Sequence, residues 1–390
     1  MPNLPQNLTV TLVLYKTSQS FPPFYKALIK IMPPPYTFHH PPSAAAAPAA
    51  ADDDGDAIVA LHSDILQTHI LTRLDGAALT SAASASSRFR RLSREDQLWR
   101  RVCSTSWPST THPRVQQAIS AFPSEHRSFF SDVFPVLDCR SLRCDLNRSS
   151  SSSTSELISA VDIHYKDKLL FSKVHSIETK TNWFLGSPFR VDLIDPKDSI
   201  PSPIRRTEKY EDWLGHLEEN LTVSWIVIDP IKNRAANVSS RQPVKARWQW
   251  LSGDIEVEYT TVMGGDGRIG SAEEMVECAV VVSCGEKEEE EEGMKMSVRE
   301  VSMRMLDMEG KHLKGKESME ILGEAMERGK RIRGKKWEGK LRFREYEERR
   351  RLRKARKERT ENALDTLCIF TGIAILFSFC SFFFFLFLST

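Results

Sequence analysis

Apolar residues recur at helical spacing in the segment from Leu61 to Cys103. Ser63 or Asp64 is expected to cap a helix, and five aliphatic side chains after them fall on one helical stripe. These five are Ile65, Leu66, Ile70, Leu71 and Leu74. Asp75-Gly76 is expected to end the helix, because glycine tolerates the left-handed conformation of a C-terminal cap. Taken alone, the stripe fits either a docking helix or the core helix of an ordinary small bundle.

Two shorter helical patterns follow this stripe. Residues 77–87 are rich in Ala and Ser, with Leu79 near the start, and such small side chains let helices approach closely. Residues 88–92 form a basic-aromatic link, and Leu98 and Trp99 then mark a short apolar helix. The segment contains no catalytic constellation. We therefore interpret it as a compact helical docking module of an adaptor rather than as part of an enzyme.

This order of helices resembles the F-box, the three-helix motif that docks on the Skp-type adaptor of cullin ubiquitin ligases. His62 stands where the usual pattern has Pro, and residues 84–89 replace a Val-Cys-Lys-x-Trp-like segment. The resemblance implies a non-catalytic substrate receptor that binds the adaptor and, through it, a cullin. Asp64 and Arg73 also match the pattern, and the residues expected to make or support the adaptor contact are Leu61, Ile65, Leu66, Ile70, Leu71, Leu74, Leu79, Leu98 and Trp99.

The sequence of residues 66–76 resembles that of one plant subfamily of F-box proteins. Members of this subfamily carry a β-rich region C-terminal to the F-box and often a hydrophobic C-terminal tail. The hydrophobic pattern here agrees, because it changes to short alternating runs after residue 156. Seven or eight such strands predict an antiparallel β-sandwich. The expected strands are residues 157–165, 169–174, 189–193, 221–228, 244–250, 254–263, 278–282 and 294–306.

Five tryptophans fall in the β-rich region, and exposed ones would suit a sugar or peptide platform. Trp248 and Trp250 share one face of an expected strand, with Arg247 and Gln249 on the other. Because large aromatic residues are usually buried, we expect Trp248 and Trp250 to face the core first and to serve as a ligand platform second.

The C-terminal tail is apolar enough to cross a membrane. Residues 366–388 are 23 positions without a charge, about 34 Å long as a helix. Residues 349–359 hold eight Lys or Arg in eleven positions, so the positive-inside rule places the N-terminal bulk in the cytosol. The membrane is expected to be an endomembrane, with the endoplasmic reticulum favoured. A nuclear localisation signal or nucleic-acid patch is the alternative interpretation of the basic run.

Charge balance, cysteine spacing and the context of one glycine motif argue against nucleic-acid, zinc and dinucleotide binding. Lys plus Arg number 54 and Asp plus Glu 52, so no overall field favours nucleic acid. Seven scattered cysteines lack zinc spacing, and we interpret them as reduced thiols. Residues 265–270 fit G-x-G-x-x-G, but too few residues follow for a crossover helix, so a hairpin loop is favoured. We expect no cofactor, no metal and no catalytic residues.

The sequence therefore predicts an α+β chain with a three-helix F-box, an antiparallel β-sandwich-like domain, a charged helix and a transmembrane helix. The alternative function is a membrane-anchored lectin-like or peptide-binding protein with a vestigial F-box. Met32 is an alternative to Met1 as the expected start of the protein. The expected segments are 1–56 (disordered arm), 57–104 (F-box), 105–148 (helical extension), 149–155 (Ser-rich linker), 156–310 (β-rich, substrate-binding), 311–363 (charged helical segment) and 364–388 (transmembrane tail anchor).

Overall fold

The computed structural model describes residues 62–140, 142, 154–205, 210–265, 271–272, 274–289, 293–335 and 337–388. The expected N-terminal arm, Leu61, most of the Ser-rich linker and most of the G-x-G-x-x-G segment lie outside these residues. The chain divides into two compact units, which meet between Ser106 and Trp107.

The first unit is helical. It consists of α4 (Ser63–Ile65), the π-helical η1 (Leu66–Ile70), the 3-10 helix η2 (Leu71–Arg73), α5 (Gly76–Ala85), α6 (Ser87–Leu92) and α7 (Asp96–Ser106). The N-terminal helical region is thus confirmed. The segment expected as a basic-aromatic link is itself a helix, α6, because Ser86 caps its start by accepting the Phe89 amide at 3.2 Å.

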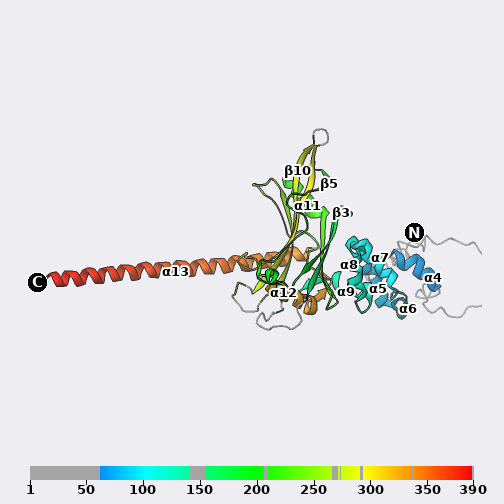
Figure 1. The fold of residues 1–390 in the computed structure, drawn as a ribbon, viewed down its shortest axis with the longest axis horizontal. Helices are drawn as coiled ribbons and strands as arrows, with labels where there is room; N and C mark the ends of the chain where they lie inside the picture. Colours follow the sequence, from blue (N-terminus) through cyan, green and yellow to red (C-terminus); the bar gives the residue numbers. More distant parts are fainter. Residues whose placement is uncertain are drawn as a thin grey trace, which may run out of the picture. The chain divides into compact units, whose positions relative to one another are not determined.

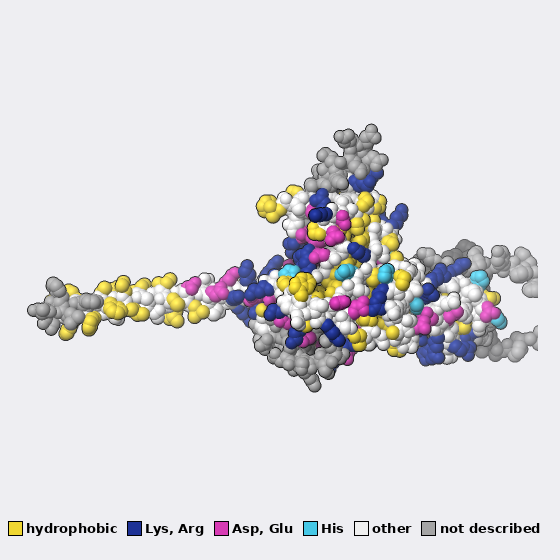
Figure 2. Space-filling model, viewed as in Figure 1, with side chains coloured by type: hydrophobic (Ala, Val, Ile, Leu, Met, Phe, Trp, Pro, Cys, Tyr) yellow, Lys and Arg dark blue, Asp and Glu magenta, His cyan; other side chains and the backbone are white. Residues whose placement is uncertain are grey.

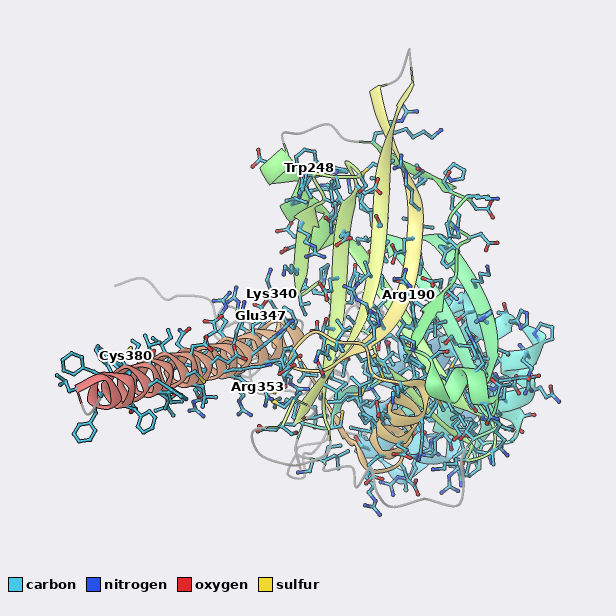
Figure 3. The ribbon with its side chains drawn as sticks, turned by 60° about the vertical axis from the view of Figure 1, so that its left-hand side comes forward. Arg190, Trp248, Lys340, Glu347, Arg353 and Cys380 are labelled. Atoms are coloured by element: carbon cyan, nitrogen blue, oxygen red, sulfur yellow. The ribbon has the colours of Figure 1, made fainter. Side chains whose placement is uncertain are left out.

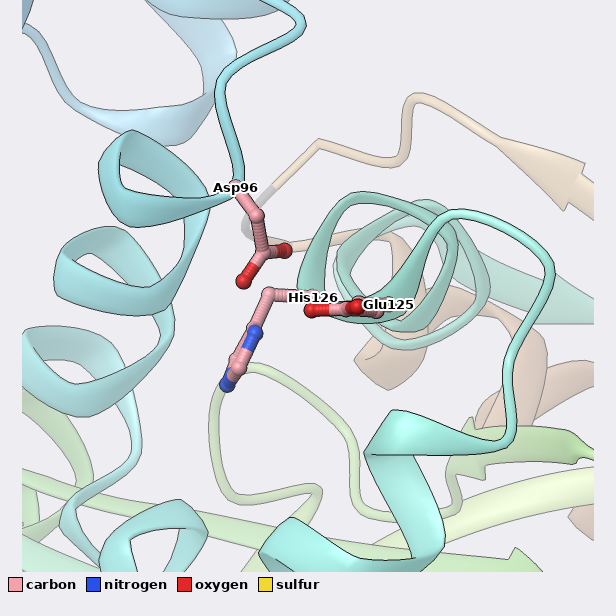
Figure 4. A group of neighbouring side chains, drawn as sticks. All are labelled: Asp96, Glu125 and His126. Carbon is pink, nitrogen blue, oxygen red and sulfur yellow. The ribbon is translucent and has the colours of Figure 1, made fainter.

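The second unit begins with short helices. These are η3 (Pro108–Thr111), α8 (Pro113–Ser120) and α9 (Glu125–Val133). Trp107 packs edge-on against Phe129 of α9, with ring centroids 6.2 Å apart. Figure 4 shows Glu125, which has a φ of 41°, and the buried His126 at the start of α9; Asp96, also drawn, lies in the first turn of α7.

A four-stranded antiparallel sheet follows, in the order β3-β2-β6-β7 (Figure 1). A two-residue turn joins its first hairpin, and both turn residues, Lys166 and Asp167, have positive φ values of 49° and 62°. Such a turn matches the right-handed twist of paired strands. The strands are β2 (Glu156–Tyr165), β3 (Lys168–Glu178), β6 (Leu221–Asp229) and β7 (Arg234–Asn237).

A six-stranded antiparallel sheet has the order β4-β11-β10-β9-β8, with β5 also paired to β11. The hairpin expected around Ser252-Gly253 is present as β8 and β9, with Trp248 opposite Ile255. Gly253 has a φ of 69° in its turn, where a side chain would be strained. The strands are β4 (Arg190–Asp192), β5 (Ile200–Arg205), β8 (Lys245–Trp248), β9 (Ile255–Gly264), β10 (Met275–Glu289) and β11 (Gly293–Leu306).

The two sheets share one hydrophobic core. Val161 and Trp225 from the smaller sheet and Val257 and Val280 from the larger one are fully buried members of the same cluster. The hydroxyl of Tyr259 donates a hydrogen bond to the carbonyl oxygen of Leu221 at 2.7 Å, which links β9 to the start of β6. The α+β class with antiparallel sheets is therefore confirmed.

Among the described residues, four strands escaped the sequence pattern, β5 and β7 among them. β5 contains Pro201 and Pro203, which have no amide hydrogen to give to a ladder, and it pairs with β11 on one side only. β7 has only four residues and two of them are Ala, so its alternation is too short to read. Pairing with a longer neighbour, rather than local pattern, makes these two segments strands.

The expectation that Trp248 and Trp250 face the core is wrong. Trp248 is 48% exposed and Trp250 75%, and the neighbouring Leu251 is 78% exposed. β8 ends at Trp248, so Trp250 lies in the turn that leads to β9 rather than on the strand face that was expected. Trp213 and Trp225 are buried instead.

The segment after β11 is not a single charged helix. It forms α12 (Gly315–Arg328), the short strand β12 (Lys330–Ile332) and the first part of α13 (Glu338–Leu388). α12 buries Ile321, Leu322 and Met326 in the same core as the sheets, so it is part of the β-rich unit. β12 pairs with β1 (Val136–Asp138), and the remaining helices are α10 (Asn182–Gly186) and α11 (Tyr210–Asn220).

The last helix, α13, runs away from the sheets for most of its length (Figure 1). Lys and Arg side chains gather near its beginning, and hydrophobic side chains line its far part (Figure 2). Among the described residues it is the helix long and apolar enough to cross a membrane, and its apolar stretch is not covered by the rest of the protein.

Candidate functional site

The first helical stretch is irregular. His62 is its N-cap and accepts the Asp64 amide at Nδ1 over 3.4 Å, so the expected cap at Ser63 or Asp64 is wrong. The helix then widens, because the Leu71 amide donates to the carbonyl of Leu66, five residues earlier. Single wide turns of this kind often occur at functional sites.

The wide turn decides which aliphatic side chains are buried. Leu66 and Leu71 are 0% and 1% exposed, and Leu74 is also buried. Ile65 is 45% exposed and Ile70 is half-buried. The expected single stripe of five is therefore wrong. Because Leu66 and Leu71 are five residues apart across the wide turn, Leu66 rather than Ile65, and Leu71 rather than Ile70, is buried in the core of the unit.

The helix ends before Gly76, not at it. Leu74 is extended, and Asp75 caps the next helix by accepting the Ala78 amide at 2.7 Å. Gly76 is the first residue of α5 and has no positive φ, so the expected left-handed cap is wrong. α5, which falls in the Ala/Ser-rich segment expected to be helical, buries Leu79, Ala82 and Ala83.

Two hydrogen bonds connect the later helices of this unit. The indole N–H of Trp99 donates to the Ser93 carbonyl at 2.6 Å, which joins α7 to the end of α6. Arg90 on α6 donates to the Ala83 carbonyl of α5 at 3.2 Å. The side chain of Gln67 also donates to the carboxylate of Glu95, which ties the first helix to the start of α7. No pattern in the sequence predicted these contacts.

Most of the expected adaptor-binding residues form the core of the unit. Leu66, Leu71, Leu74, Leu79, Leu98 and Trp99 are all 6% exposed or less, whereas Ile65 and Ile70 reach the surface. Cys103 is fully buried, and this burial raises the pKa of its thiol to about 12, so the thiol is neutral and packs as a small apolar group.

Comparisons with known proteins agree with this module. A family model described as F-box-like matches residues 65–105. The chain is 43% identical over 332 residues to the F-box protein At2g27310 of Arabidopsis thaliana, covering 82% of this chain and 94% of that protein. The chain belongs to the plant F-box proteins.

Two further relatives extend over the same share of this F-box protein. It is 43% identical over 321 residues to the probable F-box protein At2g36090 of Arabidopsis thaliana, covering 82% of this chain and 90% of the relative. It is 42% identical over 324 residues to the F-box protein At3g44326 of the same plant, covering 82% and 88%. No solved structure matches this chain.

The family supports a substrate-recognition role in an Skp–cullin–F-box ligase and binding to an Skp-type adaptor. F-box proteins are in general adaptors without catalytic activity of their own. The β-rich unit adds a second candidate site at its surface, the turn between β8 and β9, where Trp248, Trp250 and Leu251 are exposed. Arg247 beside this turn pairs with Glu256 at 2.6 Å.

Proposed function

We propose that this F-box protein is the membrane-tethered substrate-recognition subunit of an Skp–cullin–F-box ubiquitin ligase and promotes ubiquitination of its substrate. The observation that carries the proposal is the presence, in one chain, of an F-box-like helical unit and a separate β-rich unit with its own core. The protein performs no bond chemistry. It raises the effective concentration of substrate near a ubiquitin-conjugating enzyme.

In this proposal Ile65 and Ile70 contact the Skp-type adaptor directly, because their side chains reach the surface of the first helix. Leu66, Leu71 and Leu74 hold that helix in place from inside. Leu79, Leu98 and Trp99 have the same supporting role, and Leu61 precedes the described residues.

The β-rich unit selects the substrate. Exposed tryptophans are frequent anchors of binding sites, because they combine a large apolar surface with an N–H donor. The exposed Trp248, Trp250 and Leu251 make the β8–β9 turn the first place to look for substrate contact.

The apolar part of α13 anchors the protein in an endomembrane, with the endoplasmic reticulum as the first choice and the two units in the cytosol. Its support is the length and composition of the helix and the basic run that precedes its apolar part. The sequon Asn220-Leu-Thr tests this orientation in cells: it stays unmodified in the cytosol, and N-glycosylation there would contradict the proposal.

The exposed tryptophans also favour a second candidate function, a membrane-anchored lectin-like or peptide-binding protein whose F-box is vestigial. The deciding experiment is co-precipitation of the full chain with a plant Skp-type adaptor, alongside Ile65→Asp. Binding by the wild type and not by the variant supports the ligase role. Binding by neither, together with glycan-array binding that Trp250→Ala removes, supports the second function.

A further inference from the structure

The first turns of α13 are fixed to the β-rich unit. Phe343 and Tyr346 are 6% and 0% exposed, in a cluster with Val262 and Met275. The hydroxyl of Tyr346 donates to the Asp307 carbonyl at 3.2 Å, and Lys340 forms an ion pair with Glu218 at 2.6 Å. The helix therefore leaves the sheets in a defined direction rather than as a free tether.

The fixation continues into the basic run. Arg353 donates to the Ser271 carbonyl, and the ammonium of Lys357 lies 3.1 Å from the carboxylate of Glu309. Glu309 belongs to a tight turn, residues 307–311, closed by the Asp307 amide, which donates to the Lys311 carbonyl at 2.9 Å. Figure 3 shows Lys340, Glu347 and Arg353 following one another along α13, with Cys380 toward its far end. The 307–311 turn therefore lies beside Lys357.

Cations surround the helix at this level. We call residues 349–359 the basic collar; it holds eight Lys or Arg and a single acidic residue, Glu358. At about 100° per residue, Arg353 and Lys357 point toward the 307–311 turn while Arg351 and Arg359 point to the opposite side. Arg351, Lys354, Arg356 and Arg359 are all exposed. A helix with positive charge on every side is better suited to a layer of anionic groups that surrounds it than to a binding partner that contacts only one of its faces.

The collar stands a short distance from the apolar stretch. Lys357 precedes Thr366, where the uncharged stretch begins, by nine residues, or about 14 Å along a helix. The headgroup layer on each side of a bilayer is about 5–8 Å thick, and a lysine side chain extends several ångströms further. With the apolar stretch in a bilayer, the end of the collar nearest that stretch, together with the 307–311 turn beside Lys357, reaches the headgroups.

We propose that the basic collar and the 307–311 turn form a membrane-contact surface that recognises anionic lipid headgroups and holds the β-rich unit close to the bilayer. This inference rests on the membrane tether proposed above and adds the contacting residues and the lipid class. Its consequence is that the substrate-binding surface stays near the membrane, so membrane-bound proteins are the favoured substrates.

Lysine footprinting of the full chain tests the proposal. The chain is reconstituted in nanodiscs of phosphatidylcholine alone or with added phosphatidylserine, and amine acylation is followed by mass spectrometry. Lys311 and Lys354 are good reporters because their side chains are 76% and 80% exposed in the protein. We expect anionic discs to slow labelling of both lysines by about threefold or more, and about 1 M salt to remove this protection.

Charge variants give the matched comparison. Arg351→Gln with Arg356→Gln and Arg359→Gln removes three exposed collar charges, two of which, Arg351 and Arg359, face away from the Glu309 contact. Protection of Lys311 and Lys354 is therefore expected to decrease. Lys168→Gln with Lys180→Gln and Lys316→Gln removes three exposed charges elsewhere on the β-rich unit and leaves the protection unchanged.

The outcomes separate this inference from the tether itself. Failure of the chain to float with lipid vesicles would contradict the tether. Flotation with equal labelling of Lys311 and Lys354 in both kinds of disc would leave the tether standing and overturn the headgroup contact. Protection of the collar by added RNA or DNA, but not by anionic lipid, would also overturn it and assign the collar to nucleic acid.

Discussion

The carbonyl of Leu66 accepts the amide of Leu71 across a turn that is one residue wider than an α-helical turn, and both side chains are buried. Ile65 and Ile70, each one position earlier, are thereby left toward solvent. The same four aliphatic residues thus divide into two that are buried and two that reach the surface, and substitutions can test support of the helix separately from the proposed contact with the adaptor.

Ile65→Asp is expected to abolish adaptor binding and leave the fold intact, because a carboxylate at a 45% exposed position remains hydrated until a partner covers it. Co-precipitation measures binding, and circular dichroism measures folding. Gln97→Asp, an equally new carboxylate at an exposed position of α7, is the matched control and should bind normally.

Leu71→Asp with Leu74→Asp is also expected to abolish adaptor binding, but through unfolding of the first unit, because both side chains are buried. Limited proteolysis should therefore cut residues 62–106 of this variant readily. Co-purification of the double variant with the adaptor at the wild-type level would show that these helices do not carry the contact.

Asp162 is expected to be a main contributor to stability of the second unit. Its carboxylate accepts the Ser109 amide at 2.9 Å and the Ser109 hydroxyl at 2.5 Å in a buried setting, and the Ser172 hydroxyl at 2.7 Å in a partly buried one. Asp162→Ala leaves the Ser109 amide buried without this acceptor and should cost about 2–4 kcal/mol of unfolding free energy. Ser172→Ala removes one bond and should cost about 1 kcal/mol, and equal losses in denaturant unfolding would contradict this account.

Glu277 is expected to make stability depend on pH. Burial, and next the nearby carboxyl of Glu258, raise the pKa of Glu277 in the folded protein. A carboxyl with a raised pKa holds its proton more tightly when folded, so its stabilising effect is complete below the ordinary carboxyl pKa of about 4.3 and is lost as pH rises through the raised value.

Glu277→Gln keeps the shape of the side chain but removes the carboxyl group that titrates. The melting temperature of this variant should vary less with pH above about pH 5 than that of the wild type, and should be higher at alkaline pH. Glu348→Gln, at an exposed position of α13, is the control and should follow the wild-type curve. Parallel curves for Glu277→Gln and the wild type would refute this role of Glu277.

Two tryptophans should respond oppositely to truncation. Trp225 is fully buried and donates its indole N–H to the Ser159 hydroxyl at 3.2 Å, so Trp225→Ala should cost about 3–5 kcal/mol. Trp250 is 75% exposed, so Trp250→Ala should leave the melting temperature within about 1 °C and affect only ligand or substrate capture. A strongly destabilised Trp250→Ala would remove it as a binding candidate.

The helical module and the long strands could be predicted from the sequence, because the periodicity that defines each of them lies within a short segment of the chain. Leu79 lies in α5 and Leu98 and Trp99 lie in α7, where helices were expected, and the alternation from residue 254 to 263 correctly predicted β9 and its hairpin partner. Caps were misjudged at His62 and Gly76, because several neighbouring residues can accept a helix-starting amide and the choice depends on how the chain enters the helix.

The sequence by itself determined the order of elements, since helical and strand periodicities record which side chains avoid water. Tertiary structure alone decided how many faces of each helix or strand are buried from solvent by packing against other elements. Glu258 alternates with Val257 and Tyr259 along β9, so it lies on the opposite face of the strand, yet it is only 8% exposed. Nearby, Phe343 and Tyr346 of α13, more than eighty positions later in the chain, pack against Val262 on the same strand, β9. A pattern of period two identifies one buried face, but only packing with a distant helix can bury the other.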